Sequence, residues 1–387
     1  MKNCSKRRLV ASSALGTTML ALSCSTYAQS SVTLYGTLDE SIAYYNNVGN
    51  GSLVELQGAD LAANKWGMKG GEDLGGGLKA IFTLENGFNI NTGRLGQGGR
   101  EFGRQAFVGL DSQSLGTLTF GRQYDPTVDL VQGITADSYG PTFTTPGDAD
   151  NNDNSIRVSN AIKYASPVLG GLQVELLYAL GGVAGSPSSG ETFSAAAAYN
   201  NGGLSLATGY LFAKNDDVNA GGTSDLIQNN SVTPLFDAIP MVGSRQIFHV
   251  AAQYVIGSLT ANIRYSNAQY KPYTQFAAFN RTETYNTGAA SLGYQATPFV
   301  LLAVGYTYTH SSGASSANYH SVAAGATYSL SKTTTLYAAA GYAHANGTTF
   351  SSDGESIVPA TGAVGDLTSS SSTPNQVSVV AGIVHKF

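Results

Sequence analysis

Aspartates are concentrated in one long segment of the chain, residues 124–155. This segment has no Lys or Arg, and its acids include Asp129, Asp137, Asp148, Asp150 and Asp153. Closely spaced carboxylates can bind a metal ion, and carboxylates that face basic groups across an aqueous passage can select solutes by charge. The spacing of these residues, and the elements that hold them, decide between these two chemistries.

The acidic run that starts at Asp148 begins like a calcium-binding loop but departs from that pattern. Its sixth position is Asp153, where the sharp turn needs Gly, and its twelfth is Ser159, where a bidentate Glu is needed. Two interpretations of this run remain. One is a weak site for a divalent cation at Asp148, Asp150 and Asp153, and the other is a solvated acidic loop. The five histidines have no i, i+4 partner and no nearby Cys, which argues against a zinc site.

No catalytic motif is found elsewhere in the chain. The glycine-rich run 96–101 ends in Glu101, where a dinucleotide-binding pattern needs a third glycine. There is no phosphate-binding loop that ends in Gly-Lys-Ser/Thr, and no Gly-x-Ser-x-Gly nucleophile elbow. We therefore predict that the protein is not an enzyme and needs no cofactor.

The elements around these residues are predicted to be β-strands, because apolar and polar residues alternate from end to end. In residues 300–309, one face carries Val300, Leu302, Val304, Tyr306 and Tyr308, and the other is small and mostly polar. Sixteen strands are predicted, near residues 31–44, 61–71, 76–88, 103–112, 115–123, 155–165, 171–181, 191–200, 203–213, 245–257, 258–270, 282–297, 298–310, 318–331, 333–345 and 375–387.

Short turns alternate with long polar loops between these strands. Residues 112–114 and 201–202 are examples of the turns, and residues 46–60, 89–102 and the acidic segment are the first three long loops. An even number of strands with short connections on one side and long ones on the other is typical of bacterial outer-membrane barrels. We predict an all-β, 16-stranded antiparallel transmembrane β-barrel with its third loop folded into the bore.

The N-terminus has the form of a secretory signal peptide. Lys2, Lys6, Arg7 and Arg8 precede an apolar stretch, and a small-residue cleavage site ends at Ala28. We predict that residues 1–28 are removed and that 29–387 form the barrel. The alternative hypothesis is a lipoprotein signal that is cleaved before a lipidated Cys24. Removal of the signal peptide takes away four of the 20 basic residues and none of the 25 acidic ones, which leaves 16 basic and 25 acidic residues and a net charge of −9. This negative charge argues against a nucleic-acid partner.

The overall composition also favours a barrel over a soluble protein. Charged residues make up 12% of the chain, about half the usual ~25%, and no run of eighteen apolar residues is present. The alternative is a secreted soluble sandwich or solenoid. No 20–50-residue repeat supports a solenoid, and the polar strand faces carry small residues where a sandwich would expose charges.

Charged residues on strands are predicted to face the bore, because a charge on the lipid face near the midplane costs about 2–4 kcal/mol. The alternation places Lys65, Lys69, Lys79, Glu85, Arg157 and Lys163 inward, and Arg122 and Arg264 are further candidate lumen charges. Arg104 stays unassigned on this ground, because either set of residues in 105–110 could face outward.

Three stretches resemble the trimeric general porins of Gram-negative outer membranes, in the form common in β-proteobacteria. They are residues 65–82, which begin Lys65-Trp66-Gly67-Met68-Lys69-Gly70, residues 104–110, which begin Arg104-Gln105-Ala106-Phe107, and residues 121–126, Gly121-Arg122-Gln123-Tyr124-Asp125-Pro126. The start of the mature chain, 31–36, and a terminal Phe387 match as well. The likeness covers essentially the whole mature chain.

This resemblance implies a homotrimer in the outer membrane, with a constriction loop, here about 124–155, opposite a ladder of basic wall residues. By motif, the resemblance assigns the wall bases to Lys65, Arg104 and Arg157 and the loop acids to Asp129 and Asp137, and so turns Arg104 towards the bore. Lys65 stands where many relatives carry Arg, and the loop is unusually rich in Asp near 148–153. The resemblance also implies that the β-barrel assembly machinery recognises Phe387.

The function expected from this resemblance is passive diffusion of inorganic ions and small hydrophilic solutes, selected by size and charge. A channel specific for one sugar or organic anion is one alternative, and a structural or adhesive barrel with a plugged bore is another. Conductance measurements on the trimer distinguish the three. Open-channel current with weak solute block indicates the general pore, and block at low solute concentration indicates the specific channel. The absence of current indicates the structural barrel.

Overall fold

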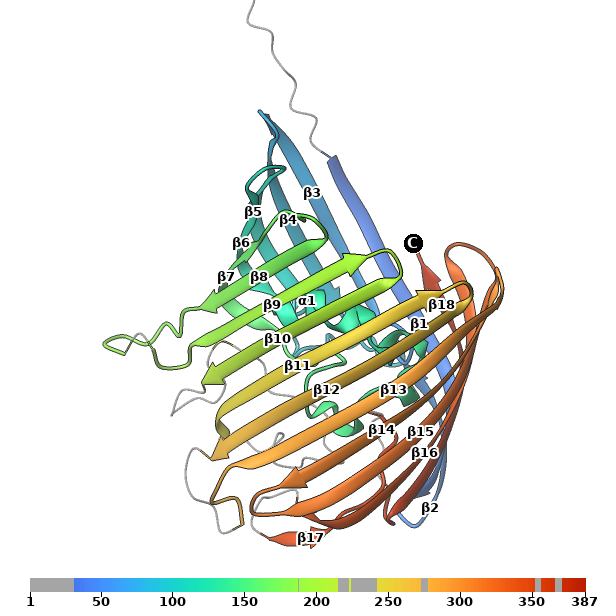
Figure 1. Cartoon of the computed structure of the whole chain (residues 1–387). Helices are drawn as coiled ribbons and strands as arrows, with labels where there is room; N and C mark the ends of the chain where they lie inside the picture. The colour runs from blue at the N-terminus through green and yellow to red at the C-terminus, as the bar shows by residue number, and fades with distance from the viewer. Residues whose placement is uncertain are drawn as a thin grey trace, which may run out of the picture.

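The strands form one antiparallel sheet that closes on itself (Figure 1). The structure is a computed structural model that describes residues 31–186, 188–214, 223, 242–272, 278–351, 356–365 and 371–387. Closure is made by β1 (Ser31–Val48) and β18 (Asn375–Lys386), which pair from Thr37–Lys386 to Tyr45–Ser378. The predicted signal peptide lies outside the described residues.

In the described part of the chain, sixteen strands build the wall. The sheet has 18 strands, but β2 (Gly51–Gly58) and β3 (Lys65–Gly75) pair in turn with β1 and form one interrupted wall strand, and β17 (Ile357–Pro359) pairs only with residues 348–350 at the end of β16. The others are β4 (Leu78–Gly87), β5 (Gln105–Ser112), β6 (Gly116–Gln123), β7 (Val158–Ala165), β8 (Leu172–Ala179), β9 (Thr192–Asn201), β10 (Leu204–Lys214), β11 (Val242–Ile256), β12 (Leu259–Pro272), β13 (Glu283–Thr297), β14 (Val300–Ser312), β15 (Ser316–Ser329) and β16 (Thr334–Phe350). The predicted fold class is confirmed.

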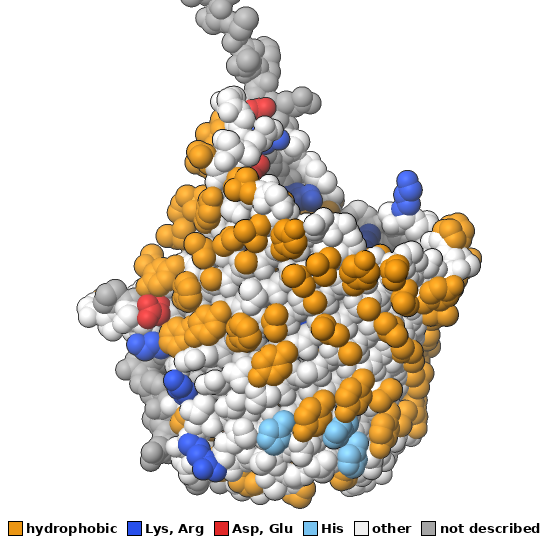
Figure 2. Space-filling view, in the orientation of Figure 1, with side chains coloured by type: hydrophobic (Ala, Val, Ile, Leu, Met, Phe, Trp, Pro, Cys, Tyr) orange, Lys and Arg blue, Asp and Glu red, His pale blue; other side chains and the backbone are white. Residues whose placement is uncertain are grey.

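The predicted alternation gives the barrel an apolar outer face. On β14, Val304 and Tyr306 are 54% and 45% exposed on the outside, whereas Ala303 and Thr307 are buried inside. Apolar side chains are spread across the face of the barrel that Figure 2 shows, between backbone and other uncharged side chains. A closed sheet pairs its backbone groups between strands, as hydrocarbon surroundings require. None of the helices in the described ranges is long and apolar enough to cross a membrane.

Two local predictions are wrong. Residues 46–60, predicted as a loop, contain β2, because Gly49 and Asn50 both have positive φ, 57° and 66°, and make a two-residue hairpin turn. The strand predicted at 61–71 begins only at Lys65.

The alternation predicted for 155–165 also fails at its start. Ile156 and Val158, expected outward from the same alternation, are fully buried in the barrel interior, because β7 begins only at Val158 and a bulge around Asn160, with φ of 54°, shifts its register against β6. Ile162 and Tyr164 keep the predicted outward direction, each 37% exposed, and Lys163 points inward towards the acidic loop.

The third long loop folds into the barrel, as predicted. It carries α1 (Pro126–Leu130), which lies inside the ring of strands in Figure 1, and the short helices η1 (Gln132–Ile134), η2 (Ala136–Tyr139), η3 (Pro141–Phe143) and η4 (Pro146–Asp148). Asp125 caps α1 by accepting a hydrogen bond of 2.8 Å from the Thr127 backbone N–H. Tyr139 and Phe143 pack on the inner faces of Ala303 and Ala323, which anchors the loop across the bore.

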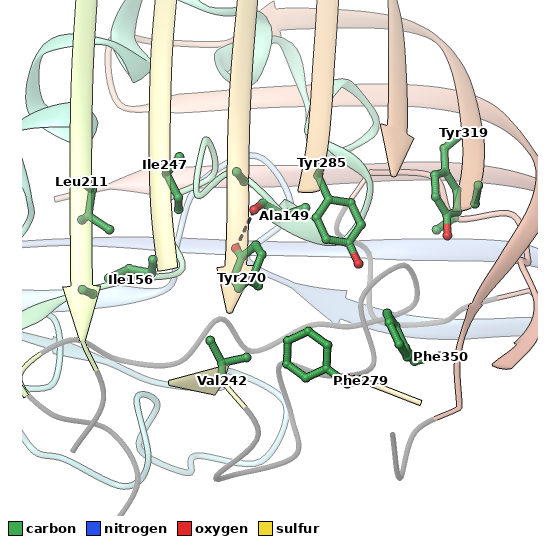
Figure 3. Close-up of a cluster of buried hydrophobic side chains, with 14 of the residues drawn as sticks. Ala149, Ile156, Leu211, Val242, Ile247, Tyr270, Phe279, Tyr285, Tyr319 and Phe350 are labelled. Carbon is green, nitrogen blue, oxygen red and sulfur yellow. Dashed lines mark hydrogen bonds between the residues drawn. The ribbon is translucent and has the colours of Figure 1, made fainter. Parts of the chain in front are cut away.

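A cluster of buried hydrophobic side chains fills another part of the interior (Figure 3). Wall residues such as Ile247 and Tyr285 meet Phe279 and Phe350 from the ends of strands and connections, and the Tyr270 hydroxyl donates to the Ala149 carbonyl at 2.6 Å. This apolar fill was not predicted from the sequence. It restricts where water and solutes can pass, because part of the bore is packed like a protein core.

Candidate functional site

Glu85 is the centre of a charged cluster on the inner wall. It lies on β4 and is 2% exposed. Its carboxylate accepts hydrogen bonds from Arg104 Nε and the Tyr124 hydroxyl at 2.8 Å each and from the Tyr35 hydroxyl at 2.9 Å. Lys65 Nζ lies 3.6 Å away. Glu85 therefore neutralises part of the predicted basic wall while holding its side chains in place.

The Tyr124 ring organises the two arginines of this wall. The guanidinium groups of Arg104 and Arg157 each lie 5.6 Å from the ring centroid, and Arg104 also donates to the Tyr124 hydroxyl at 2.7 Å. Burial raises the pKa of Tyr124, so its hydroxyl stays protonated and donates to Glu85. Arg157 donates to the Ser155 carbonyl at 3.0 Å. Planar guanidinium groups against an aromatic face are held more rigidly than lysine side chains would be.

The two predicted loop acids are held differently. Asp129, in α1, forms an ion pair with Lys163 of β7, whose ammonium also donates to the Tyr124 carbonyl at 3.2 Å. Asp137, in η2, accepts a hydrogen bond of 2.6 Å from Gln132 of the same loop. The ion pair ties the acidic loop to the wall beside the arginines.

The basic residues of the wall and the acids of the loop line one cavity of about 700 Å³ inside the barrel. All five predicted constriction residues border it: Lys65, Arg104, Arg157, Asp129 and Asp137. Three further charged residues that the predicted constriction did not include complete the lining: Asp60, Asp153 and Lys386. Among the described residues, the lining thus holds four basic and four acidic side chains.

Among the described residues, none of the remaining predicted lumen charges lines this cavity; Glu85 and Lys163 lie directly behind it, paired with Arg104 and Asp129, and the others lie farther away. Lys69 lies 5.3 Å above the Tyr35 ring, and Lys79 stands between Asp73 and Asp111 in strand register near the short turns. Arg122 is buried and donates to the Gly103 carbonyl at 2.7 Å and to Ser159 Oγ at 2.8 Å. It does not border the cavity.

Arg264 anchors the acidic loop instead of facing solutes. Its guanidinium lies 2.7 Å from Asp150 Oδ2, and both side chains are almost fully buried. Burial alone would raise the pKa of Asp150, but Arg264 and the hydroxyl of Ser266 outweigh it and lower that pKa to about 2. Asp148 accepts from the backbone N–H groups of Asp153 and Ser155.

These contacts bear on the cation alternative at Asp148, Asp150 and Asp153. The carboxylates of Asp148 and Asp150 are engaged by protein donors, which a cation would have to displace. Among the described residues, no group of three or more His, Cys, Asp or Glu side chains is arranged to hold a metal ion.

Phe387 completes the closure of the barrel. Its backbone exchanges two hydrogen bonds with Gly36, of 3.0 Å and 3.1 Å. A Cβ atom at Gly36 would lie 2.3 Å from the Phe387 ring and 2.8 Å from the Lys65 carbonyl oxygen, so a larger residue would displace the ring and press on the backbone of β3. The Phe387 side chain itself is 53% exposed on the barrel.

The sequence of this barrel matches the profile of a known protein family. The profile of the Gram-negative porin family matches residues 11–348. The chain belongs to the Gram-negative porin family. Together with the closed barrel, this places the protein in the outer membrane.

Individual porins share sequence with the chain. An outer membrane porin protein of Bordetella pertussis is 36% identical over 39% of this chain and 43% of its own length. Outer membrane porin protein 32 of Delftia acidovorans is 34% identical over 49% of this chain and 56% of its own length, so the chain spans about half of these two relatives. The major outer membrane protein P.IB of Neisseria meningitidis is 30% identical over 81% of this chain and 88% of its own length.

Solved porin structures share the fold. An anion-selective porin from Comamonas acidovorans superposes with a TM-score of 0.71 at 23% identity, covering 93% of this chain and all of that one. The trimer form of OmpT from Vibrio cholerae gives a TM-score of 0.64 at 16% identity, covering 92% of this chain and 99% of that one.

Proposed function

We propose that this porin forms a water-filled channel for passive diffusion of inorganic ions and small hydrophilic solutes. The observation that carries the proposal is the cavity of about 700 Å³ inside a closed barrel, lined by charges of both signs. Solutes would be selected by the width of this cavity and by its charges. The family is one of channels, which agrees with a chain in which no catalytic motif is found.

The arrangement of charges supports a transverse field at the constriction. The arginines and Lys65 lie on the wall side, and Asp129 and Asp137 lie on the loop that crosses the bore. Water oriented by such a field would be displaced at a cost by apolar solutes, so the constriction would favour hydrophilic ones. Lys65 contributes a compact, strongly hydrated charge, whereas Arg104 and Arg157 present planar groups that suit carboxylates.

We infer weak selectivity between anions and cations. In the described part of the lining there are four charges of each sign, and immediately behind it Glu85 offsets Arg104 while Lys163 offsets Asp129. The balance favours a small reversal potential in a salt gradient. The solved Comamonas acidovorans porin is described as anion-selective, and its 23% identity to this chain leaves room for a different charge balance.

We also propose a homotrimer that is assembled by the β-barrel assembly machinery and surrounded by outer-membrane lipid. Support for the trimer comes from the solved trimer form of the Vibrio cholerae barrel with the same fold. Support for recognition by the assembly machinery comes from the exposed Phe387 at the end of the closing strand.

Single-channel recording of the purified protein in a planar bilayer tests the proposal. Stepwise ohmic current with weak solute block is expected. Block at low solute concentration would indicate a substrate-specific channel instead, and correctly folded protein that gives no current would refute the channel.

A further inference from the structure

The second wall strand of the barrel is interrupted by an inserted segment, residues 59–64. On β1, Thr37 pairs with Lys65 and Glu40 pairs with Gly58. The six residues 59–64 therefore stand opposite only two residues of β1, Leu38 and Asp39. A continuous antiparallel ladder would need two residues there, so four extra residues leave the plane of the wall. This is a large bulge, and bulges redirect side chains beside functional sites.

Asp39 fixes the direction in which the segment leaves the wall. Its carboxylate accepts hydrogen bonds from the backbone N–H groups of Leu61 at 2.6 Å and Ala62 at 2.7 Å, and from the hydroxyl of Tyr337 at 2.6 Å. Asp39 is fully buried, and Tyr337 lies on the inner face of β16, so these contacts draw the segment into the barrel.

A second set of bonds secures the end of the segment. The Asp39 N–H donates to Asn64 Oδ1 at 2.7 Å, and Asn64 Nδ2 donates to the Asp39 carbonyl at 2.9 Å. Leu61 and Ala62 also pack against an apolar cluster that includes Ala43, Tyr337 and Val380. Polar and apolar contacts together therefore hold the segment in one position. A loop of the same length without such contacts would have no fixed position.

The inserted segment borders the proposed constriction. Residues 59–63 line the same cavity as Arg104, Arg157 and Asp137. Asp60 accepts hydrogen bonds from the Ser41 hydroxyl and from Gln57 Nε2, the latter at 2.7 Å, so its carboxylate is held at a defined place. The loop 124–155 contributes other residues to the same lining, including Asp129 and Asp137.

We propose that residues 59–64 form a second constriction element that works together with the loop 124–155, and that Asp60 is a residue that determines charge selectivity. The inference rests on the proposed channel function. Acids would then enter the solute path from two independent elements, and the width of the channel would depend on a wall segment as well as on the third loop.

Removing residues 60–63 tests the effect on width. The deletion leaves Ala59 opposite Asp39 and Asn64 opposite Leu38, and an even number of deleted residues keeps every side chain on its present face. Asp39→Asn accompanies the deletion, so that no buried carboxylate loses its backbone donors. We expect the single-channel conductance to increase by roughly 1.5-fold or more, since the cross-section of the constriction grows.

Ala63→Trp makes the opposite change without altering the backbone. The bulky side chain enters the cavity, and we expect conductance to fall to about half. Ala324→Trp is the matched control, because Ala324 is exposed on the outer face of β15. The heat-modifiable band on a gel establishes for each variant that the barrel is folded, and Ala63→Trp decides the question if the deletion does not fold.

Asp60→Asn tests the selectivity, with Asp73→Asn as a matched control that removes the same charge near the β3–β4 turn, away from the cavity. We expect Asp60→Asn to move the reversal potential towards anion preference and Asp73→Asn to leave it unchanged. A wild-type protein without current would refute the channel itself. Wild-type current that neither Ala63→Trp nor Asp60→Asn alters would refute only the role of this segment.

Discussion

Neutralising Asp129 and Asp137 together should turn the channel towards anions. Asp129→Asn removes the ion-pair partner of Lys163, and Asp137→Asn removes a carboxylate held by Gln132. Both side chains border the cavity, and asparagine keeps their shape. The cavity therefore gains two units of positive charge with little change in its width.

The size of the effect follows from the dimensions of the cavity. A volume of about 700 Å³ places an ion at its centre about 7 Å from the charged groups of the lining. At that distance in water, two unit charges change the energy of an ion by about 1.2 kcal/mol, and screening at 0.1 M salt leaves about 0.6 kcal/mol. The ratio of anion to cation permeability should therefore rise by about sevenfold, which in a tenfold salt gradient shifts the reversal potential by roughly 35 mV.

The assay is the reversal potential of purified protein in a planar bilayer under that gradient, at two ionic strengths. The control is Asp73→Asn with Asp111→Asn, which removes the same charge near the short turns, where both residues pair in register with Lys79. A shift of less than about 5 mV in the test variant, or an equal shift in the control, would show that the loop acids do not govern selectivity.

Three further results are expected. Glu85→Gln leaves the buried Arg104 without its counter-ion, so the free energy of unfolding in urea should fall by about 3–5 kcal/mol and anion preference should increase. An unchanged free energy of unfolding would contradict the role of Glu85 as the centre of the cluster. Arg264→Ala should release the loop by leaving Asp150 buried without its partner, seen as faster proteolysis within 124–157 of folded protein. In the wild type the pKa of Asp150 is about 2, below its ordinary 3.8, so this anchor should hold above about pH 4 and weaken only as the pH falls towards 2; loosening near pH 6 would count against it. Gly36→Val should reduce the folded fraction on gels because its side chain would overlap the Phe387 ring, and a normal yield would show that closure tolerates bulk there.

Arg104 shows where periodicity stops being informative. It lies one residue before β5, outside the regular ladder, so alternation within 105–112 could not determine its direction. Its burial against Glu85 and Tyr124 comes from contacts with residues 19 and 20 positions away. The resemblance to porins placed it towards the bore, and the structure explains that placement by the hydrogen bonds it makes there.

The sequence by itself determined the wall of this protein. Alternation is a local property of each strand, and the cost of exposing charge to lipid assigns one face outward, so the strands, their even number and most wall charges could be predicted. Only the tertiary structure decided how the bore is filled. The inward course of residues 59–64, the pairing of Arg264 with Asp150 across 114 positions, and the apolar cluster around Tyr270 and Phe279 depend on contacts between distant segments, and no local pattern encodes them. These contacts exist because closing the barrel brings its walls and loops within reach of one another.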